Sequence, residues 1–153
     1  MGRYVADVLQ RMKIPFVIVE YDSLKVDALK ESDFPVLFGD AQKEIILEAV
    51  ALGQARMIVI TTPVTIISKT IVIAAKKLNP NIHIIARAEE IESMQVLHDL
   101  GVSLVIQPEF EASLEFARQA LLHLGIPVTQ IEQYTDRVRT ELYRPLYAAD
   151  EAE

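Results

Sequence analysis

Residues 1–22 read MGRYVADVLQRMKIPFVIVEYD, an amphipathic helix followed by an apolar strand that ends in an acid. The apolar positions of the helix are Val5, Val8, Leu9 and Met12. This order is that of the second half of a dinucleotide-binding βαβ unit, in which a strand and a G-x-G-x-x-G turn come first and an acid follows about 20 positions after the glycines. The leading strand and the first two glycines are absent, which leaves Gly2 as the candidate third. The sequence therefore predicts a nucleotide-binding module with an incomplete phosphate loop.

Composition limits the class of protein. A chain of 153 residues with 51% hydrophobic content can bury one sizeable core but hardly two, so a single main domain is expected. The absence of cysteine excludes disulfides and thiolate metal sites. The net charge of −7 argues against a nucleic-acid partner. No apolar run reaches the roughly 20 residues of a membrane span, and no signal peptide is recognisable, so no direct membrane insertion is expected.

Short apolar runs alternate with segments of helical period, which is typical of a parallel sheet covered on both faces. Strands are predicted at 16–20, 35–38, 57–61, 82–86 and 103–106. Helices are expected between them, with Asp22 as an N-cap and with Gly101 and Gly125 at left-handed C-caps. The fold class is therefore α/β, a Rossmann-like doubly wound parallel sheet that lacks its first strand.

The chain divides into a nucleotide-binding domain at 1–125 and a C-terminal tail at 126–153. A final helix is predicted over Pro127 to Tyr147, followed by a disordered acidic end. Tyr134, Tyr143 and Tyr147 of this tail can pack on the domain or dock on a partner, and the sequence does not decide between the two.

Gly2 and Glu20 carry the nucleotide chemistry of the opening stretch. Gly2 can serve close packing of helix and strand, and the helix after it offers free N–H groups and a positive dipole end for an anion. The alternative is that Gly2 is only the neighbour of the start codon or a cloning remnant. Glu20 can accept both ribose hydroxyls of an adenosine, which favours NAD(H) or an adenine nucleotide over NADP. The alternative for Glu20 is a solvated acid in a loop. For Asp22 the sequence favours a helix N-cap over a ligand contact, although one side chain can do both.

Other polar residues follow the later strands. Thr61 and Thr62 lie at the switch point where ligands bind in open α/β sheets, although Thr62-Pro63 also fits a turn before a helix. The spacing of Tyr21 and Lys25 resembles that of a reductase proton donor, but it lies at the adenosine end of the sheet and is a coincidence. The three histidines are scattered along the sequence, with no nucleophile or carboxylate pair at the spacing of a metal or catalytic site. No catalytic or metal-binding residue is predicted.

Four motifs carry a resemblance to a known family. They are Gly-Arg-Tyr at 2–4, Val-Glu-Tyr-Asp at 19–22, Phe-Gly-Asp-Ala at 38–41 and Ile-Ile-Ala-Arg-Ala at 84–88. Together they resemble the N-terminal domain of the regulator-of-potassium-conductance (RCK) family, also called the TrkA-N domain, over nearly all of residues 2–124. Within it, the cytosolic domain of Kef-type monovalent cation:proton antiporters is the most similar, on the Ala-Arg-Ala strand end and the helix at 111–121.

The resemblance implies roles for further residues. It places Asp40 and Ala41 at the edge of the adenine, while a helix N-cap is the alternative for Asp40. It places Arg87 near a regulatory glutathione or nucleotide site, while a salt bridge with Glu89 or Glu90 is the alternative. The full set of candidate nucleotide-binding residues is Gly2, Arg3, Glu20, Tyr21, Asp22, Gly39, Asp40, Ala41, Thr61, Thr62, Pro63 and Arg87.

The function that the resemblance implies is regulation of ion transport. Such a domain dimerises, binds NAD(H), AMP or another adenine nucleotide on the cytoplasmic side of the cell membrane, and gates a transmembrane potassium or sodium/proton transport domain. Binding is expected to be impaired by the incomplete loop. The alternatives are a fragment of a small NAD-dependent oxidoreductase and a dimerisation module that no longer binds nucleotide.

The missing first strand predicts a structural compensation. In the full fold that strand is central, so its absence exposes two neighbouring strand edges. Three outcomes are open. The strands that begin near Phe16 and Met57 can pair directly, a partner chain can fill the gap by strand exchange, or the sheet can split. The apolar edges predict a homodimer or higher homo-oligomer.

Overall fold

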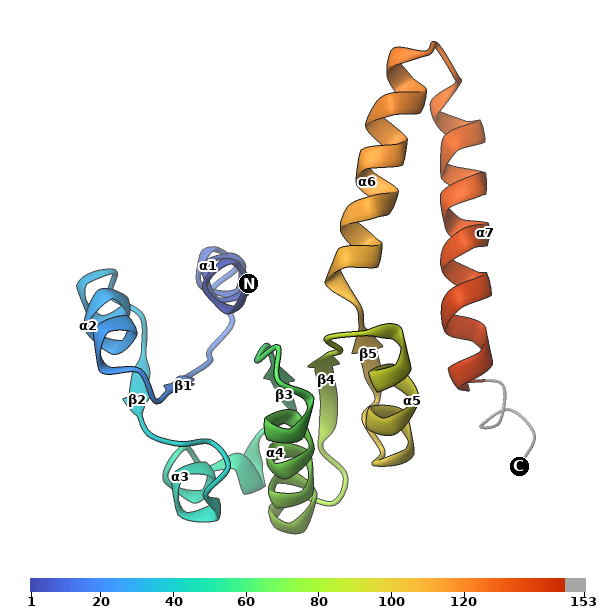
Figure 1. Cartoon of the computed structure of the whole chain (residues 1–153). Coiled ribbons are helices and arrows are strands. Elements are labelled where there is room, and N and C mark those ends of the chain that lie inside the picture. The colour runs from blue at the N-terminus through green and yellow to red at the C-terminus, as the bar shows by residue number, and fades with distance from the viewer. Residues whose placement is uncertain (148–153) are drawn as a thin grey trace.

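Five short strands lie in the part of the chain that the computed structural model describes, residues 1–147. They are β1 (Ile18–Glu20), β2 (Val36–Phe38), β3 (Met57–Ile60), β4 (His83–Arg87) and β5 (Leu104–Ile106). All lie within the predicted ranges or extend one residue beyond them. All pairings among them are parallel, and helices alternate with the strands along the chain (Figure 1), so the α/β class predicted from the sequence is confirmed.

The helices begin and end where local signals place them. They are α1 (Gly2–Arg11), α2 (Ser23–Glu31), α3 (Glu44–Ala49), α4 (Thr65–Leu78), α5 (Ile91–Asp99), α6 (Pro108–His123) and α7 (Val128–Tyr147), with a 3₁₀ turn η1 (Leu52–Gln54) after α3. Asp22 caps α2 by accepting hydrogen bonds from the N–H groups of Leu24 and Lys25. Gly101 and Gly125 have φ angles of 81° and 76°, as predicted for left-handed C-caps.

The strands form two separate sheets. β1 pairs with β2, and β3, β4 and β5 pair in that order. Of the three predicted compensations, the structure shows the split, and direct pairing of β1 with β3 is wrong. Figure 1 shows the β1–β2 pair standing apart from β3, with α1 above the space between them. Val17 before β1 and Met57 at the start of β3 accordingly stay exposed.

Each sheet has its own apolar cluster, which is the physical reason that the split is tolerated. Ala6, Leu29 and Phe34 bury the β1–β2 sheet beneath α1 and α2. The main core lies around β4, where Ile84 and Ala86 pack among α4, α5 and η1. The expectation of one sizeable core therefore holds for the larger sheet, and a small second cluster accompanies it.

The final helix turns back on the domain. α6 and α7 form a hairpin that projects from the sheets (Figure 1), and Ile131 is 1% exposed. At the far end of α7, Leu146 enters the main core and Tyr143 and Tyr147 pack against it. Tyr134 stays exposed. Two of the three tail tyrosines thus pack on the domain. The division of the chain at residue 125 stays a prediction, and the acidic end at 150–153 lies outside the described residues.

Candidate functional site

The candidate residues gather where the parallel strands end. We call this edge the carboxyl rim and define it by Glu20 after β1, Gly39 after β2, Thr61 after β3 and Arg87 at the end of β4. Because the strands within each sheet run in the same direction, their carboxyl ends lie on one edge of that sheet, which is where open α/β sheets bind ligands.

Gly2 brings the start of α1 to this rim. A Cβ added at Gly2 would lie 2.8 Å from the Thr61 Oγ1, so the helix and the end of β3 approach too closely for a side chain. This is the close-packing job predicted for the third glycine of the loop. The contact bridges the space between the two sheets and places the N-terminus of α1 at the end of β3.

Glu20 is half-buried at the end of β1, and its carboxylate is oriented by the turn that follows. Its Oε1 accepts hydrogen bonds from the N–H groups of Tyr21 (2.9 Å) and Asp22 (3.0 Å). Among residues 1–147 the Oε2 has no hydrogen-bond partner, so one oxygen of a fixed carboxylate stays available. The Tyr21 side chain itself is exposed, and Asp22 is occupied in capping α2.

Gly39 and Asp40 form the neighbouring part of the rim. The Gly39 N–H donates to the Glu20 carbonyl at 2.9 Å, which extends the β1–β2 ladder to the rim. Asp40 Oδ1 accepts from the backbone and side-chain amides of Gln42, at 2.9 and 3.1 Å. The N-cap alternative for Asp40 is therefore wrong, because α3 begins at Glu44 and Asp40 closes a turn before it.

The remaining candidates lie around this arrangement. Thr62 and Pro63 form the irregular turn between β3 and α4, and Thr62 is half-buried. Ala41 packs against the main core. The Arg3 guanidinium points to α2, where it donates to the Ser32 hydroxyl at 3.3 Å. Ligand roles for all twelve candidates stay predictions.

Arg87 pairs across the rim with the helix that follows β5. Its Nη2 lies 2.9 Å from Glu109 Oε1, and its side chain is 20% exposed. The alternative partners Glu89 and Glu90 were wrong for a physical reason. The parallel register sets Arg87 opposite Ile106, so the residues just after β5 reach Arg87, while the chain after Arg87 turns away into α5.

Two polar residues near Arg87 were not predicted. Gln107 is buried, and its Oε1 accepts a hydrogen bond from the Phe110 N–H at the start of α6. Glu109 lies in the first turn of α6, where a carboxylate is favoured by the helix dipole. The Gln-Pro-Glu sequence at 107–109 is a helix-start signal that could have identified them.

Other kinds of site are not formed by the described residues. Within 1–147 no three His, Asp or Glu side chains are grouped to hold a metal ion. No helix in this part of the chain has the length and apolar character to cross a membrane. Two surface hollows lie away from the rim, one on α6 beside Phe116 and one on α7 beside Tyr134.

Comparison with known proteins places this geometry in a family. The profile of the TrkA-N domain matches residues 1–108. The chain belongs to the TrkA-N domain family. The family predicted from the four sequence motifs is thus confirmed.

Two curated relatives show where such domains occur. The glutathione-regulated potassium-efflux protein KefC of Klebsiella pneumoniae is 28% identical over 143 residues, 94% of this chain and 22% of its own length. Potassium channel protein 1 of Methanocaldococcus jannaschii is 29% identical over 123 residues, 79% of this chain and 37% of its own length. The chain therefore spans well under half of each relative.

Solved structures agree on the fold. The TrkA-N domain of the inner membrane protein YbaL from Escherichia coli superposes with a TM-score of 0.70 at 28% identity, covering 81% of this chain and 88% of that one. The C-terminal domain of Kef from Shewanella denitrificans, in its AMP-bound form, has a TM-score of 0.70 at 23% identity and covers 86% and 94%. The GsuK channel bound to NAD has a TM-score of 0.64 at 21% identity and covers 69% and 19%. The Rossmann-like class is confirmed by these likenesses.

Proposed function

We propose that this chain is a regulatory domain that binds NAD(H), AMP or a similar adenine nucleotide at the carboxyl rim and controls potassium or other monovalent cation transport. The observation that carries the proposal is the meeting of Gly2 with Thr61, and the Glu20 carboxylate, held by two backbone donors, supports it. The names of the relatives, which are potassium transporters and channels, support the physiological part.

The start of α1 suits the phosphate of such a ligand. The first backbone bonds of the helix run from the N–H groups of Tyr4 and Val5 to the Met1 carbonyl, so those of Gly2 and Arg3 have no helical acceptor. No acidic residue stands in the first turn. A phosphate there would meet free donors and the positive end of the helix dipole without a competing carboxylate.

Glu20 suits the ribose of the same ligand. Its free Oε2 can accept a ribose hydroxyl, and the carboxylate is held in place by two backbone donors. A negative side chain at this position repels a 2′-phosphate, so we expect NADPH to bind more weakly than NADH. AMP carries no 2′-phosphate, so the AMP-bound form of the similar Kef domain agrees with this preference for ligands without one.

Regulation follows if the ligand favours one arrangement of an assembly. We propose that the domain works as a homodimer or higher oligomer on the cytoplasmic side of the membrane, joined to a transmembrane transport domain. A ligand shifts such an equilibrium only by its difference in affinity for the two arrangements. We propose a regulatory role and no catalytic one, because the relatives are named as potassium transporters and channels.

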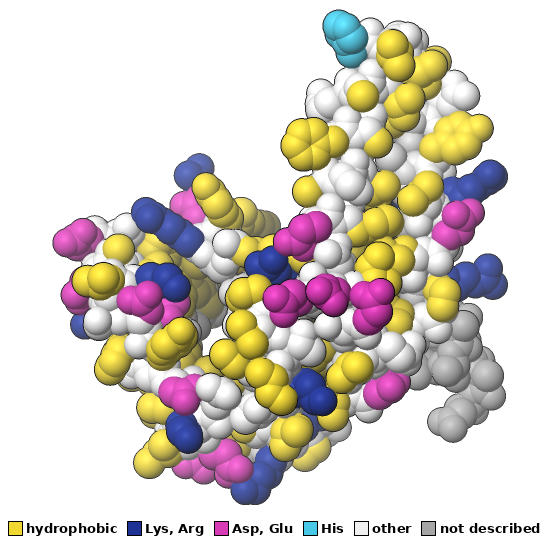
Figure 2. Space-filling view, in the orientation of Figure 1, with side chains coloured by type: hydrophobic (Ala, Val, Ile, Leu, Met, Phe, Trp, Pro, Cys, Tyr) yellow, Lys and Arg dark blue, Asp and Glu magenta, His cyan; other side chains and the backbone are white. Residues whose placement is uncertain are grey.

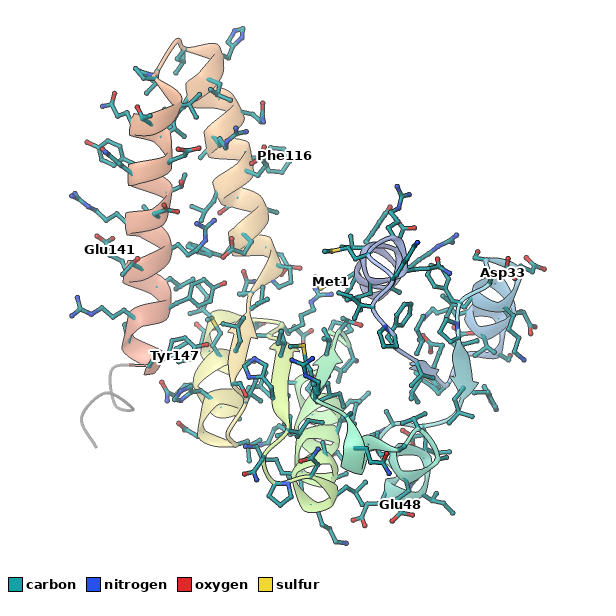
Figure 3. All side chains as sticks on the ribbon, turned by 180° about the vertical axis from the view of Figure 1, so that it is seen from behind. Met1, Asp33, Glu48, Phe116, Glu141 and Tyr147 are labelled. Atoms are coloured by element: carbon teal, nitrogen blue, oxygen red, sulfur yellow. The ribbon has the colours of Figure 1, made fainter. Side chains whose placement is uncertain are left out.

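Isothermal titration calorimetry of the chain with AMP, NADH, NAD and NADPH tests the proposal. Glu20→Gln should weaken AMP and NADH about 10- to 100-fold, the value of a hydrogen bond to a charged group. Glu48→Gln is the matched control, because Glu48 is an exposed acid on α3 (Figure 3).

The other outcomes select the alternatives. Binding without any effect of Glu20→Gln would contradict the ribose assignment. NADH oxidation with small carbonyl substrates would favour the oxidoreductase fragment. If no nucleotide produces heat and the chain still sediments as a dimer, the dimerisation module replaces the sensor.

A further inference from the structure

We propose that a hydrogen-bonded relay centred on Gln107 links Arg87 at the carboxyl rim to Tyr143 on α7, so that an anion binding to Arg87 loosens the turn of α7 around Tyr143 from the start of α6. The inference rests on the proposed function, since the anion is the phosphate or carboxylate of the regulatory ligand. It assigns to α7 the role of the element that responds.

Arg87 has spare capacity for an anion. Only its Nη2 bonds to Glu109, and its Nε is shielded from solvent with no partner among residues 1–147. A shielded guanidinium donor without an acceptor is unfavourable, and a phosphate or carboxylate with two oxygens can satisfy two guanidinium donors at once. Glu109 supplies one oxygen to Arg87 and is 62% exposed, so an incoming anion can displace it at modest cost.

Gln107 connects this ion pair to the start of α6. Its Nε2 donates to Glu109 Oε2 at 3.0 Å, using the carboxylate oxygen that Arg87 leaves free, and to the Glu89 carbonyl at 3.4 Å. Its Oε1 accepts from the Phe110 N–H. The Gln107 side chain is buried and fully bonded, so it cannot follow Glu109 without disturbing the first turn of α6.

The same residue also reaches α7. The Gln107 N–H donates to the Tyr143 hydroxyl at 3.3 Å, and the Tyr143 ring makes an edge contact with Phe110 at 5.9 Å between centroids. A shift of the Gln107 backbone or of Phe110 therefore reaches Tyr143 directly. After Tyr143, α7 is held by Tyr147 and by Leu146 in the core, so the loosening is confined to the turn of α7 around Tyr143.

The charges around Glu109 favour movement of its carboxylate toward solvent once it is displaced from Arg87. Figure 2 shows acidic side chains in a row at the base of the α6–α7 hairpin, with a cation beside them. Glu111 on the next part of α6 is already paired with Arg139 of α7 at 3.1 Å. Once an anion takes Arg87, the Glu109 carboxylate stands near like charges without a cation of its own, and it is expected to move toward solvent.

Amide hydrogen exchange at Gln107, followed by NMR, tests the relay without any ligand. Glu109→Ala and Arg87→Ala should each speed exchange of the Gln107 amide about fivefold or more. Together they should be non-additive, because both break the same ion pair. Glu141→Ala, at an exposed acid on α7 (Figure 3), is the control and should leave that exchange unchanged.

The outcomes separate the relay from the proposed function. An unchanged Gln107 amide in both single variants overturns the relay whatever AMP does. An effect of Glu109→Ala alone, with Arg87→Ala silent, also overturns it, because loss of a helix-start charge explains that result. If AMP binds the unaltered chain and does not speed Gln107 exchange, the relay fails while nucleotide binding stands. If both variants loosen α7 but AMP does not bind, the proposed function fails alone.

Discussion

Tyr147→Phe removes one oxygen atom from the interface between α7 and the sheet. The Tyr147 hydroxyl accepts a hydrogen bond from the Val105 N–H at 3.1 Å, on the side of β5 that no strand covers. The ring stays in the variant, so its edge contact with His98, at 5.1 Å between centroids, is preserved. Figure 3 labels Tyr147 at the end of α7, beside α5. The substitution therefore isolates the hydroxyl.

The expected cost follows from burial. Val105 is 0% exposed, so its N–H cannot simply exchange the tyrosine for water. Leaving a buried backbone donor without an acceptor costs about 1–3 kcal/mol, more than the net value of an ordinary hydrogen bond. For a domain of this size, that loss lowers the melting temperature by about 2–4 °C per kcal/mol.

Urea unfolding monitored by far-UV circular dichroism measures the free energy of unfolding. Tyr134→Phe is the matched control, because Tyr134 lies on the same helix, is 55% exposed and has no hydrogen bond among the described residues. We expect less than about 0.5 kcal/mol from the control. Exchange of the Val105 amide, measured by NMR, should rise in Tyr147→Phe and stay unchanged in Tyr134→Phe.

A free energy of unfolding equal in the two variants would refute the reasoning. Such a result, with Val105 protection unchanged, would mean that α7 does not complete the edge of β5 in solution. A loss of stability without faster Val105 exchange would place the effect elsewhere on α7 and would contradict the hydrogen bond as its cause.

Three further predictions concern stability. Gly39→Ala would place a Cβ 2.8 Å from the Ile46 Cδ1, so it should lower the free energy of unfolding by about 1–3 kcal/mol. The double variant that adds Ile46→Ala should recover part of this loss, and equal losses in the single and double variants would contradict the clash. Asp22→Ala removes the cap of α2 and should cost about 1 kcal/mol by urea unfolding, whereas Asp27→Ala inside the helix should cost less. Burial raises the pKa of Tyr143 above its usual 10.0, with the Glu111 charge adding to it and the Gln107 N–H opposing it. Because the folded pKa is the higher one, this contribution to stability is complete below pH 10 and is lost as the pH rises through the folded pKa, so alkaline destabilisation should be weaker in Tyr143→Phe than in the unaltered chain.

Local signals predicted the elements well. Short continuous apolar runs placed all five strands, because strands of a parallel sheet carry apolar residues at successive positions. Asp22, Gly101 and Gly125 were found by rules that depend only on the chain within a few residues. The close approach of Gly2 to the end of β3 agrees with the motif, because the third glycine of the loop allows a helix and a strand to pack closely.

Long-range choices were harder to predict. The ion-pair alternative for Arg87 named acids close in sequence, yet its partner comes from beyond β5 through the parallel register. The split of the sheet depends on whether each half can bury its own apolar cluster, and that requires the packing of Ala6 on Phe34, which no local pattern encodes. Gln107 was not predicted because glutamine is not among the residues that usually cap helices, so only Pro108 marks the start of α6 in the sequence.

The position of α7 sets a limit on any regulatory ligand. Tyr143 and Tyr147, four residues apart on one helix, accept from alternate N–H groups of the same chain segment, Gln107 and Val105. The Val105 donor on the uncovered edge of β5 and the Gln107 donor just after the strand are thereby satisfied by side chains in place of a sixth strand. Complete release of α7 would leave both N–H donors without an acceptor. The loss of free energy would be about twice that expected for Tyr147→Phe. A ligand at the rim can supply that cost only through its difference in affinity for the two states, typically about 1–3 kcal/mol. Loss of the Tyr143 bond alone lies within that range, whereas release of the whole helix does not. The response of this domain to a ligand should therefore be a shift of the turn of α7 around Tyr143 while Tyr147 stays attached to β5.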